Sequence, residues 1–159
     1  MSERKFYIDT NCEDVSGFDS GHAVFNEYLM RGGGSAVIHY LFDTESDALV
    51  AYFSLIASVL QKGSHENLTV IPAIELEMFA LDKRYQGSGA SSLLLDLVFE
   101  TIAYYSFECV GAEVILLYSV PVDHVICLYE SKGFNKVTGT LSAFKSDFTN
   151  GCIPMYMAI

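Results

Sequence analysis

A short segment rich in glycine and serine is the part of the sequence best suited to chemistry. It lies between an apolar segment and a long amphipathic one and reads Gln86, Gly87, Ser88, Gly89, Ala90, Ser91, Ser92. Glycines let the main chain approach a ligand closely, and the first amide groups of a helix are free to donate hydrogen bonds beside the positive end of the helix dipole. The segment therefore predicts a binding site for a phosphate or pyrophosphate group.

The glycine spacing does not fit two common nucleotide-binding motifs. A P-loop requires Lys followed by Ser or Thr after its glycines, and residues 86–92 contain no lysine. The dinucleotide fingerprint requires GxGxxG within a repeating βαβ unit, which is also absent. ATP and NAD are therefore not favoured as ligands. A purely structural role for the glycines, at a turn between a strand and a helix, stays open.

The segment resembles the acetyl-CoA-binding motif of the GCN5-related N-acetyltransferase (GNAT) superfamily, which is Gln/Arg-x-x-Gly-x-Gly/Ala on a strand, loop and helix. The residues from Gln86 to Ser91 match it, with serine at the last position, where the family prefers glycine or alanine. A register that starts at Arg84 also fits the letters, but it places the glycines two residues early for the helix start. The resemblance implies that acetyl-CoA is the cosubstrate.

A second motif of the same superfamily lies downstream. The residues from Tyr129 to Phe134 are similar to its Tyr-x-x-x-Gly-Phe segment, whereas Val122 stands where relatives often have a polar residue. The two motifs extend the resemblance over residues 72–134, and the first 70 residues agree only in the order helix, strand, strand. Within the superfamily, the arrangement is most similar to the acetyltransferase toxins of bacterial toxin-antitoxin pairs, which acetylate aminoacyl-tRNA.

The resemblance implies a role for each motif. The main chain from Phe79 to Leu81 would pair with the pantetheine arm, and the amides of the glycine-rich loop would hold the pyrophosphate. Tyr129 would protonate the leaving CoA thiolate, and its structural alternative is a core aromatic beside Val125. The predicted cofactor-binding residues are Phe79, Ala80, Leu81, Gln86, Gly87, Ser88, Gly89, Ala90, Ser91 and Ser92.

A base for the attacking amine is predicted on the strand before the loop. Glu75 and Glu77 lie two residues apart and so share one face of that strand, where either carboxylate could take a proton from the amine. We favour Glu77, so the predicted catalytic residues are Tyr129 and Glu77. A solvated pair of carboxylates is the structural alternative. The scattered histidines and cysteines have no spacing typical of a metal site, so no metal is predicted.

The elements that position these residues follow from hydrophobic patterning. Helices are predicted over residues 18–31, 90–107 and 122–132, and strands over residues 36–42, 49–60, 74–81, 113–119 and 153–158. Asp19 or Ser20 is the expected cap of the first helix, and residues 61–67 are expected to form a polar loop. The first two strands should pair antiparallel, whereas the alternation of strand and helix in the second half predicts parallel pairing at the centre of the sheet.

Together with the resemblance, these elements predict the fold class. It is α/β, a GNAT-type mixed α/β sandwich with a central mixed sheet of about six or seven strands and helices on both faces. We expect a single acetyltransferase domain over residues 1–159.

Charge and composition narrow the partners. The chain has 159 residues, a formal net charge of -11 and 51% hydrophobic residues. Nucleic acids and anionic membranes are bound mainly through Lys and Arg, so we expect neither as a partner. The excess of carboxylates favours a cationic acceptor. The first ten residues lack the apolar run of a signal peptide and the cysteines are isolated, so we expect a cytoplasmic protein.

The predicted function is acetyl-CoA-dependent N-acetylation of a primary amine on a cationic small molecule or a protein. One alternative is an acetyltransferase toxin that acts on aminoacyl-tRNA and has an antitoxin partner. The other is a catalytically degenerate protein that binds acyl-CoA, or a partner protein, without turnover. The apolar end segment, residues 153–159, indicates an interface and hence a homodimer.

Overall fold

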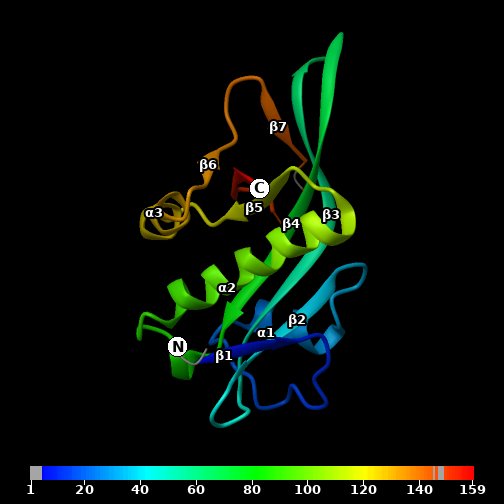
Figure 1. Cartoon of the computed structure of the whole chain (residues 1–159). Coiled ribbons are helices and arrows are strands. Elements are labelled where there is room, and N and C mark those ends of the chain that lie inside the picture. Colours follow the sequence, from blue (N-terminus) through cyan, green and yellow to red (C-terminus); the bar gives the residue numbers. More distant parts are fainter. Residues whose placement is uncertain (1–4, 145, 147–148) are drawn as a thin grey trace. The chain divides into compact units, whose positions relative to one another are not determined.

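The computed structural model of the chain describes residues 5–144, 146 and 149–159. Its elements are, in order, β1 (Phe6–Asp9), α1 (Ala23–Arg31), β2 (Val37–Asp43), β3 (Leu49–Ser64), β4 (Asn67–Leu81), a 3-10 turn (Lys83–Tyr85), α2 (Ala90–Tyr105), a π-helical turn (Ser106–Val110), β5 (Val114–Ser119), α3 (Asp123–Ser131), β6 (Asn135–Lys136), β7 (Leu141–Ala143) and β8 (Ile153–Ala158) (Figure 1). The described strands form a mixed sheet in the order β1-β2-β3-β4-β5-β8-β6, with β7 paired to β3. The predicted α/β class is confirmed, and the sheet reaches eight strands because the short strands β1, β6 and β7 add to those predicted.

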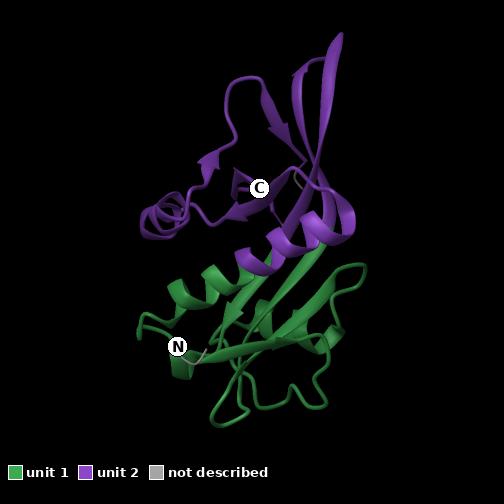
Figure 2. Cartoon of the chain, viewed as in Figure 1, with its two compact units in different colours: residues 1–56, 77–98 green, residues 57–76, 99–159 purple. Residues whose placement is uncertain are grey.

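The chain divides into two compact units, which Figure 2 colours separately. Unit 1 comprises residues 1–56 and 77–98, and unit 2 comprises residues 57–76 and 99–159. The elements β3, β4 and α2 contribute residues to both units. Among the residues that the structure describes, no helix has the length and apolar character needed to cross a membrane.

Unit 1 contains the antiparallel strands of the first half of the chain. β1 pairs with β2, and β2 pairs with β3, so that Val37 lies opposite Leu55 and Tyr40 lies opposite Tyr52. This confirms the antiparallel pair predicted from the sequence. Burial of apolar side chains from the segment before α1, from α1 itself and from β2, β3 and β4 stabilises the unit. The buried residues of this core are Phe18, Leu29, Ile38, Tyr52, Met78 and Ala80.

Helix α1 begins later than predicted. Its first residue is Ala23, and the N-cap residue His22 makes no side-chain cap hydrogen bond. The two residues expected to cap it are used elsewhere: Asp19 forms an ion pair with Lys83, and the Ser20 hydroxyl donates to the main-chain oxygen of His22. Both side chains also bond the side chain of Asn26 on α1, so they hold the preceding segment against the helix, which starts only at Ala23.

Unit 2 is built around β5. β4 pairs with β5 in parallel from Ala73↔Val114 to Leu76↔Leu117, which confirms the predicted parallel pairing. β8 pairs antiparallel with both β5 and β6, and its residue Met155 is fully buried. The apolar end segment is therefore used inside the sheet. Its hydrophobicity no longer gives a reason to infer a dimer interface.

The loop predicted over residues 61–67 is wrong. β3 continues to Ser64 and β4 begins at Asn67, so only His65 and Glu66 form the turn. Residues 62–70 are exposed. Because strands with no buried face need no alternating apolar pattern, the polar sequence of this segment predicted a loop. Gly63 has a φ of +110°, and an added Cβ would lie 2.1 Å from the main-chain oxygen of Asn67. Only glycine fits this position.

The variant Gly63→Ala should disrupt the hairpin of β3 and β4. The new methyl group would meet main chain, and the residue would have to keep a conformation that costs about 1–3 kcal/mol for an L-residue. We expect a lower thermal unfolding midpoint and faster amide hydrogen exchange in residues 61–68. Gly17→Ala is the matched control, because an added Cβ there meets nothing within 4 Å. Equal stability of the two variants would contradict the prediction.

Candidate active site

The loop after β4 has the predicted order of strand, loop and helix. β4 ends at Leu81, Asp82 caps the 3-10 turn, and α2 begins at Ala90. Gly87 and Gly89 have φ angles of +75° and +78°, in the left-handed region that favours glycine. An added Cβ at either position would meet nothing within 4 Å. Backbone conformation, and not lack of space, therefore selects glycine here.

The N-terminus of α2 follows directly on these glycines. The first amides of a helix have no acceptor within the helix, and the first turn of α2 contains no acidic residue that could repel an anion. Ala90 is buried, whereas Ser91 and Ser92 are half-buried. The first turn of α2, at the positive end of the helix dipole, is a site suited to a phosphate group.

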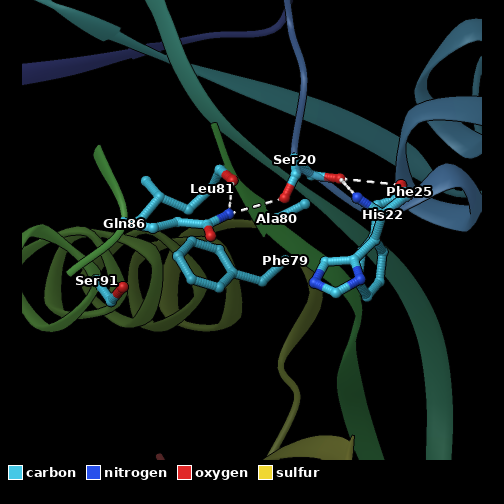
Figure 3. A pocket seen from close by; sticks show the side chains of 8 residues that line it. All are labelled: Ser20, His22, Phe25, Phe79, Ala80, Leu81, Gln86 and Ser91. Atoms are coloured by element: carbon cyan, nitrogen blue, oxygen red, sulfur yellow. Dashed lines mark hydrogen bonds between the residues drawn. The ribbon is translucent and has the colours of Figure 1, made fainter. Parts of the chain in front are cut away.

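A cavity of about 250 Å³ lies in unit 1 beside this loop. Its lining comes from the segment that leads into α1, from the end of β4, and from the loop with the first turn of α2. The lining residues are Ser20, His22, Phe25, Phe79, Ala80, Leu81, Gln86 and Ser91 (Figure 3). The last five were predicted from the sequence. The first three were missed, because no motif surrounds them.

Gln86 ties the loop to two other segments. Its Nε2 donates hydrogen bonds to the main-chain oxygens of Ser20 and Leu81, each at 2.8 Å (Figure 3). Within the loop, the Ser88 hydroxyl donates to the main-chain oxygen of Tyr85 at 2.6 Å. These bonds hold the start of the loop against the end of β4. They give Gln86 a structural role, and its contact with a cofactor stays a prediction.

The cations beside the loop are paired with carboxylates. Lys83 Nζ lies 2.6 Å from Asp19 Oδ2, and Arg84 Nε lies 2.8 Å from Asp82 Oδ1. The hydrogen bond from Lys83 lowers the pKa of Asp19, and the same bond raises the pKa of Lys83. An anion at this loop would thus meet amides rather than free cations. Within the described residues, no group of His, Cys, Asp and Glu is placed to hold a metal ion.

Asp82→Asn should destabilise unit 1. The Asp82 side chain is almost fully buried, and its oxygens accept hydrogen bonds from the main-chain amides of Asp19 and Arg84, both at 3.0 Å. Loss of the charge weakens these bonds and the ion pair with Arg84, which should cost about 1–3 kcal/mol at pH 7. Urea unfolding measures this difference. Glu27→Gln is the control, because its ion pair with Arg31 is exposed and should contribute little.

The effect of Asp82→Asn should depend on pH. Burial alone would raise the pKa of Asp82, but the hydrogen bonds from Arg84 and Asp19 outweigh it and lower the pKa. A carboxylate with a lowered pKa stabilises the folded state above its unfolded pKa of about 3.9, and this stabilisation is lost as the pH falls through the folded value. The wild type and the variant should therefore converge in acid. A constant difference from pH 7 to pH 2 would contradict this account.

The end of β4 leaves main-chain groups available. The register of β4 with β5 ends at Leu76, so the residues from Glu77 to Leu81 have no β5 partner in the described register. Phe79, Ala80 and Leu81 also line the cavity. The peptide groups of Phe79 and Ala80 are thus suited to hydrogen bonds with an extended ligand such as a pantetheine arm, whereas the Leu81 oxygen already accepts from Gln86.

Glu77 lies in a polar cluster that sequence analysis missed. Tyr28 Oη is 2.8 Å from Glu77 Oε2 and 2.9 Å from Ser54 Oγ. Desolvation of Tyr28, with Glu77 beside it, raises the pKa of the tyrosine to about 12. The phenol therefore keeps its proton at neutral pH. Glu75, the alternative base, falls in unit 2, where it lies opposite Leu116 of β5.

Tyr129 lies on α3 in unit 2. Its half-buried ring packs against Phe134 with the centroids 5.9 Å apart, as a core aromatic would. Desolvation raises the pKa of Tyr129 to about 12, so the hydroxyl stays protonated at neutral pH. In the described part of the chain this hydroxyl has no hydrogen-bond partner. A protonated phenol with an unused O–H can act as a hydrogen-bond donor.

The strand order, the loop at the start of α2 and the available end of β4 define a GNAT-type fold. No family profile and no curated protein matches the sequence. Among solved structures, a mutant of the toxin AtaT bound to the C-terminus of the antitoxin AtaR is 16% identical with a TM-score of 0.71, and the match covers 97% of this chain and 93% of that chain. AtaTR bound with AcCoA is 17% identical with a TM-score of 0.72, covering 97% and 94% of the two chains. AtaT complexed with acetyl-methionyl-tRNAfMet is 18% identical with a TM-score of 0.68, covering 91% and 97%.

At these identities the likeness shows the fold, and it confirms the GNAT type predicted from the two sequence motifs.

Proposed function

We propose that the chain is an acetyl-CoA-dependent N-acetyltransferase. The observation that carries the proposal is the loop with left-handed Gly87 and Gly89 at the N-terminus of α2, beside a cavity and within a GNAT-type fold. The similar structure of AtaTR contains AcCoA, which supports the same cosubstrate for this chain. The likeness extends over nearly the whole chain, so we also propose that both units belong to one acetyltransferase domain, with the cytoplasm, where acetyl-CoA is available, as its location.

Acetyl-CoA would be held mainly by main-chain groups. The amides of residues 87–92 would bind the pyrophosphate at the positive end of the α2 dipole. The main chain of Phe79, Ala80 and Leu81 would pair with the pantetheine arm. Lys83 and Arg84 contribute little net positive charge, because Asp19 and Asp82 pair with them. This arrangement explains how an acidic chain can bind a polyanion.

The proposed reaction transfers the acetyl group to an amine. Glu77 takes one proton from the acceptor ammonium, and the neutral nitrogen then attacks the thioester carbonyl carbon. The C–N bond forms, the C–S bond breaks, and the second proton lost by the nitrogen ends on the CoA sulfur. Tyr129 donates a hydrogen bond to that sulfur as its negative charge develops. Since a thiol has a pKa of about 8.5, a phenol with a pKa of about 12 stabilises the thiolate more readily by a hydrogen bond than by complete proton transfer.

Two classes of acceptor remain candidates. The net charge of -11 favours a cationic small molecule or protein. The complex of AtaT with acetyl-methionyl-tRNAfMet favours aminoacyl-tRNA, and it counts against our charge-based expectation that nucleic acid is not a partner. Both classes present an ammonium group, so Glu77 could serve either.

An antitoxin is the proposed protein partner. The toxin AtaT is similar over nearly the whole chain and is bound to the C-terminus of the antitoxin AtaR, which supports such a partner here. A homodimer stays a proposal without support from the apolar end segment, which is used in β8.

A binding titration followed by an acceptor panel tests the proposed function. Calorimetry with acetyl-CoA should show binding, and release of free thiol should then depend on an added amine. The panel contains a polyamine, an aminoglycoside, a lysine peptide and charged tRNA, with uncharged tRNA as the matched control. Binding without thiol release from the whole panel would favour the degenerate acyl-CoA-binding protein. Absence of binding would overturn the proposal.

A further inference from the structure

Three side chains from different elements of unit 1 meet at the hydroxyl of Tyr28. Tyr28 comes from α1, Ser54 from β3 and Glu77 from β4. The Tyr28 oxygen lies 2.8 Å from the Glu77 carboxylate and 2.9 Å from the Ser54 hydroxyl. Both distances are those of good hydrogen bonds. The cluster is therefore a connected polar network within an otherwise apolar part of unit 1.

The single hydroxyl proton of Tyr28 determines which of its two neighbours accepts the stronger hydrogen bond. Tyr28 has a single O–H, which cannot be donated to two acceptors at once. A carboxylate is the stronger acceptor because it is charged, so the phenol proton is directed to Glu77 Oε2. The fully buried Ser54 Oγ lies 2.9 Å from the same Tyr28 oxygen and is a second polar contact that holds the phenol in place. Since the pKa of Tyr28 is raised to about 12, the phenol does not lose this proton at neutral pH.

The phenol ring of Tyr28 is held by the core. It stacks on Tyr52 with an interplanar angle of 5° and a centroid distance of 6.1 Å. Tyr52 is fully buried, and its own hydroxyl donates to the main-chain oxygen of Phe25 at 2.7 Å. The position of the Tyr28 hydroxyl is thus set by helix α1 and by a buried neighbour.

The second oxygen of Glu77 is left for a ligand. In the part of the chain that the structure describes, the bond from Tyr28 is the only hydrogen bond of the Glu77 side chain. The network also adjoins the cavity at two points. Phe25, three residues before Tyr28 on α1, lines the cavity, and so does Phe79, two residues or about 7 Å beyond Glu77 on β4.

We propose that Tyr28 is a positioning residue for the acceptor half of the reaction. Its hydroxyl fixes the Glu77 carboxylate through Oε2, so that Oε1 is the oxygen that meets the ammonium group of the acceptor. This inference rests on the proposed acetyltransferase function and adds a residue that no motif of the sequence marks. A carboxylate held in this way needs less ordering when the acceptor binds, which favours proton transfer from a correctly placed amine.

The variant Tyr28→Phe tests the inference. It keeps the ring on Tyr52 and removes only the hydroxyl, so we expect kcat with the best acceptor of the panel to fall about tenfold and KM for acetyl-CoA to stay unchanged. In a Glu77→Gln background, Tyr28→Phe should cause no further loss, because it acts through Glu77. Ser54→Ala should lower kcat in the same direction by a smaller factor, and it serves as the second variant if Tyr28→Phe fails to fold.

Tyr7→Phe is the matched control. It removes a phenol hydroxyl that donates to another carboxylate, Asp47, at 3.1 Å, outside the Tyr28 cluster, so kcat should stay unchanged. Equal kcat for wild type and Tyr28→Phe, or an undiminished loss in the Glu77→Gln background, would overturn the role of Tyr28 alone. A wild-type protein that acetylates no member of the panel would instead overturn the proposed function, so the two failures are distinguishable.

Discussion

Tyr129→Phe should lower kcat about 100-fold, the effect expected for loss of one group that donates a proton or hydrogen bond in the transition state. The substitution keeps the ring that packs on Phe134, so the fold of α3 should persist. The KM for acetyl-CoA should change little, because the proposed role of the hydroxyl is to assist the leaving sulfur and not the bound ground state. Steady-state release of free CoA, measured with saturating acetyl-CoA and acceptor, gives both constants.

Two further observations check this role of Tyr129. Since burial raises its pKa to about 12, the acid form is lost only as the pH rises through that value, and the wild-type kcat should not decline between pH 8 and pH 10 through ionisation of Tyr129. Tyr104→Phe is the control, because Tyr104 is exposed and removal of its hydroxyl should leave kcat unchanged. Near-normal turnover of Tyr129→Phe would make Tyr129 a core aromatic, which its packing also allows.

Glu77→Gln should lower kcat/KM by about 10²-fold or more at neutral pH, the usual range for loss of a general base. Glutamine is close in shape and can still accept the hydrogen bond from Tyr28, so the cluster should stay intact. The loss should become smaller as the pH rises, because more of the acceptor amine is already neutral; an α-amino group has a pKa of about 8 and a lysine amine one of about 10.4. A series of kcat/KM values against pH measures this trend.

Glu75→Gln is the matched comparison for Glu77→Gln. Glu75 is the other carboxylate of β4 and lies opposite Leu116, in the segment that pairs with β5. We expect this variant to retain most of the wild-type kcat/KM. A large loss with Glu75→Gln and none with Glu77→Gln would move the base to Glu75. Small losses in both variants would indicate that no protein base is used.

Much of the fold was predictable where one face of an element is buried. The strands predicted over residues 113–119 and 153–158 agree with β5 and β8, because burial imposes apolar residues that patterning detects. Apolar patterning did not detect the strands over residues 61–67, because both strands of the hairpin are exposed there. It also misplaced the start of α1, since Asp19 pairs with Lys83 from a distant part of the chain instead of capping the helix.

The candidate site was predictable only where neighbouring residues define it. The left-handed φ angles of Gly87 and Gly89 and the start of α2 depend on adjacent residues, so their sequence was sufficient to indicate a candidate anion site. The pairing of Lys83 with Asp19 depends on a distant residue, so the local sequence did not show that the cations beside the loop are paired with carboxylates.

The glycine-rich loop and the order of strands and helices are local properties that the amino-acid pattern indicates, and the resemblance of two motifs to a known family indicated the GNAT type. The environment of Glu77 is different. Tyr28 is 49 positions away from it, and Ser54 belongs to a third element, so no local pattern links them. Only the packing of α1 against β3 and β4 in unit 1 places a phenol beside that carboxylate. A side chain whose partner is distant in the chain acquires its chemistry when the chain folds.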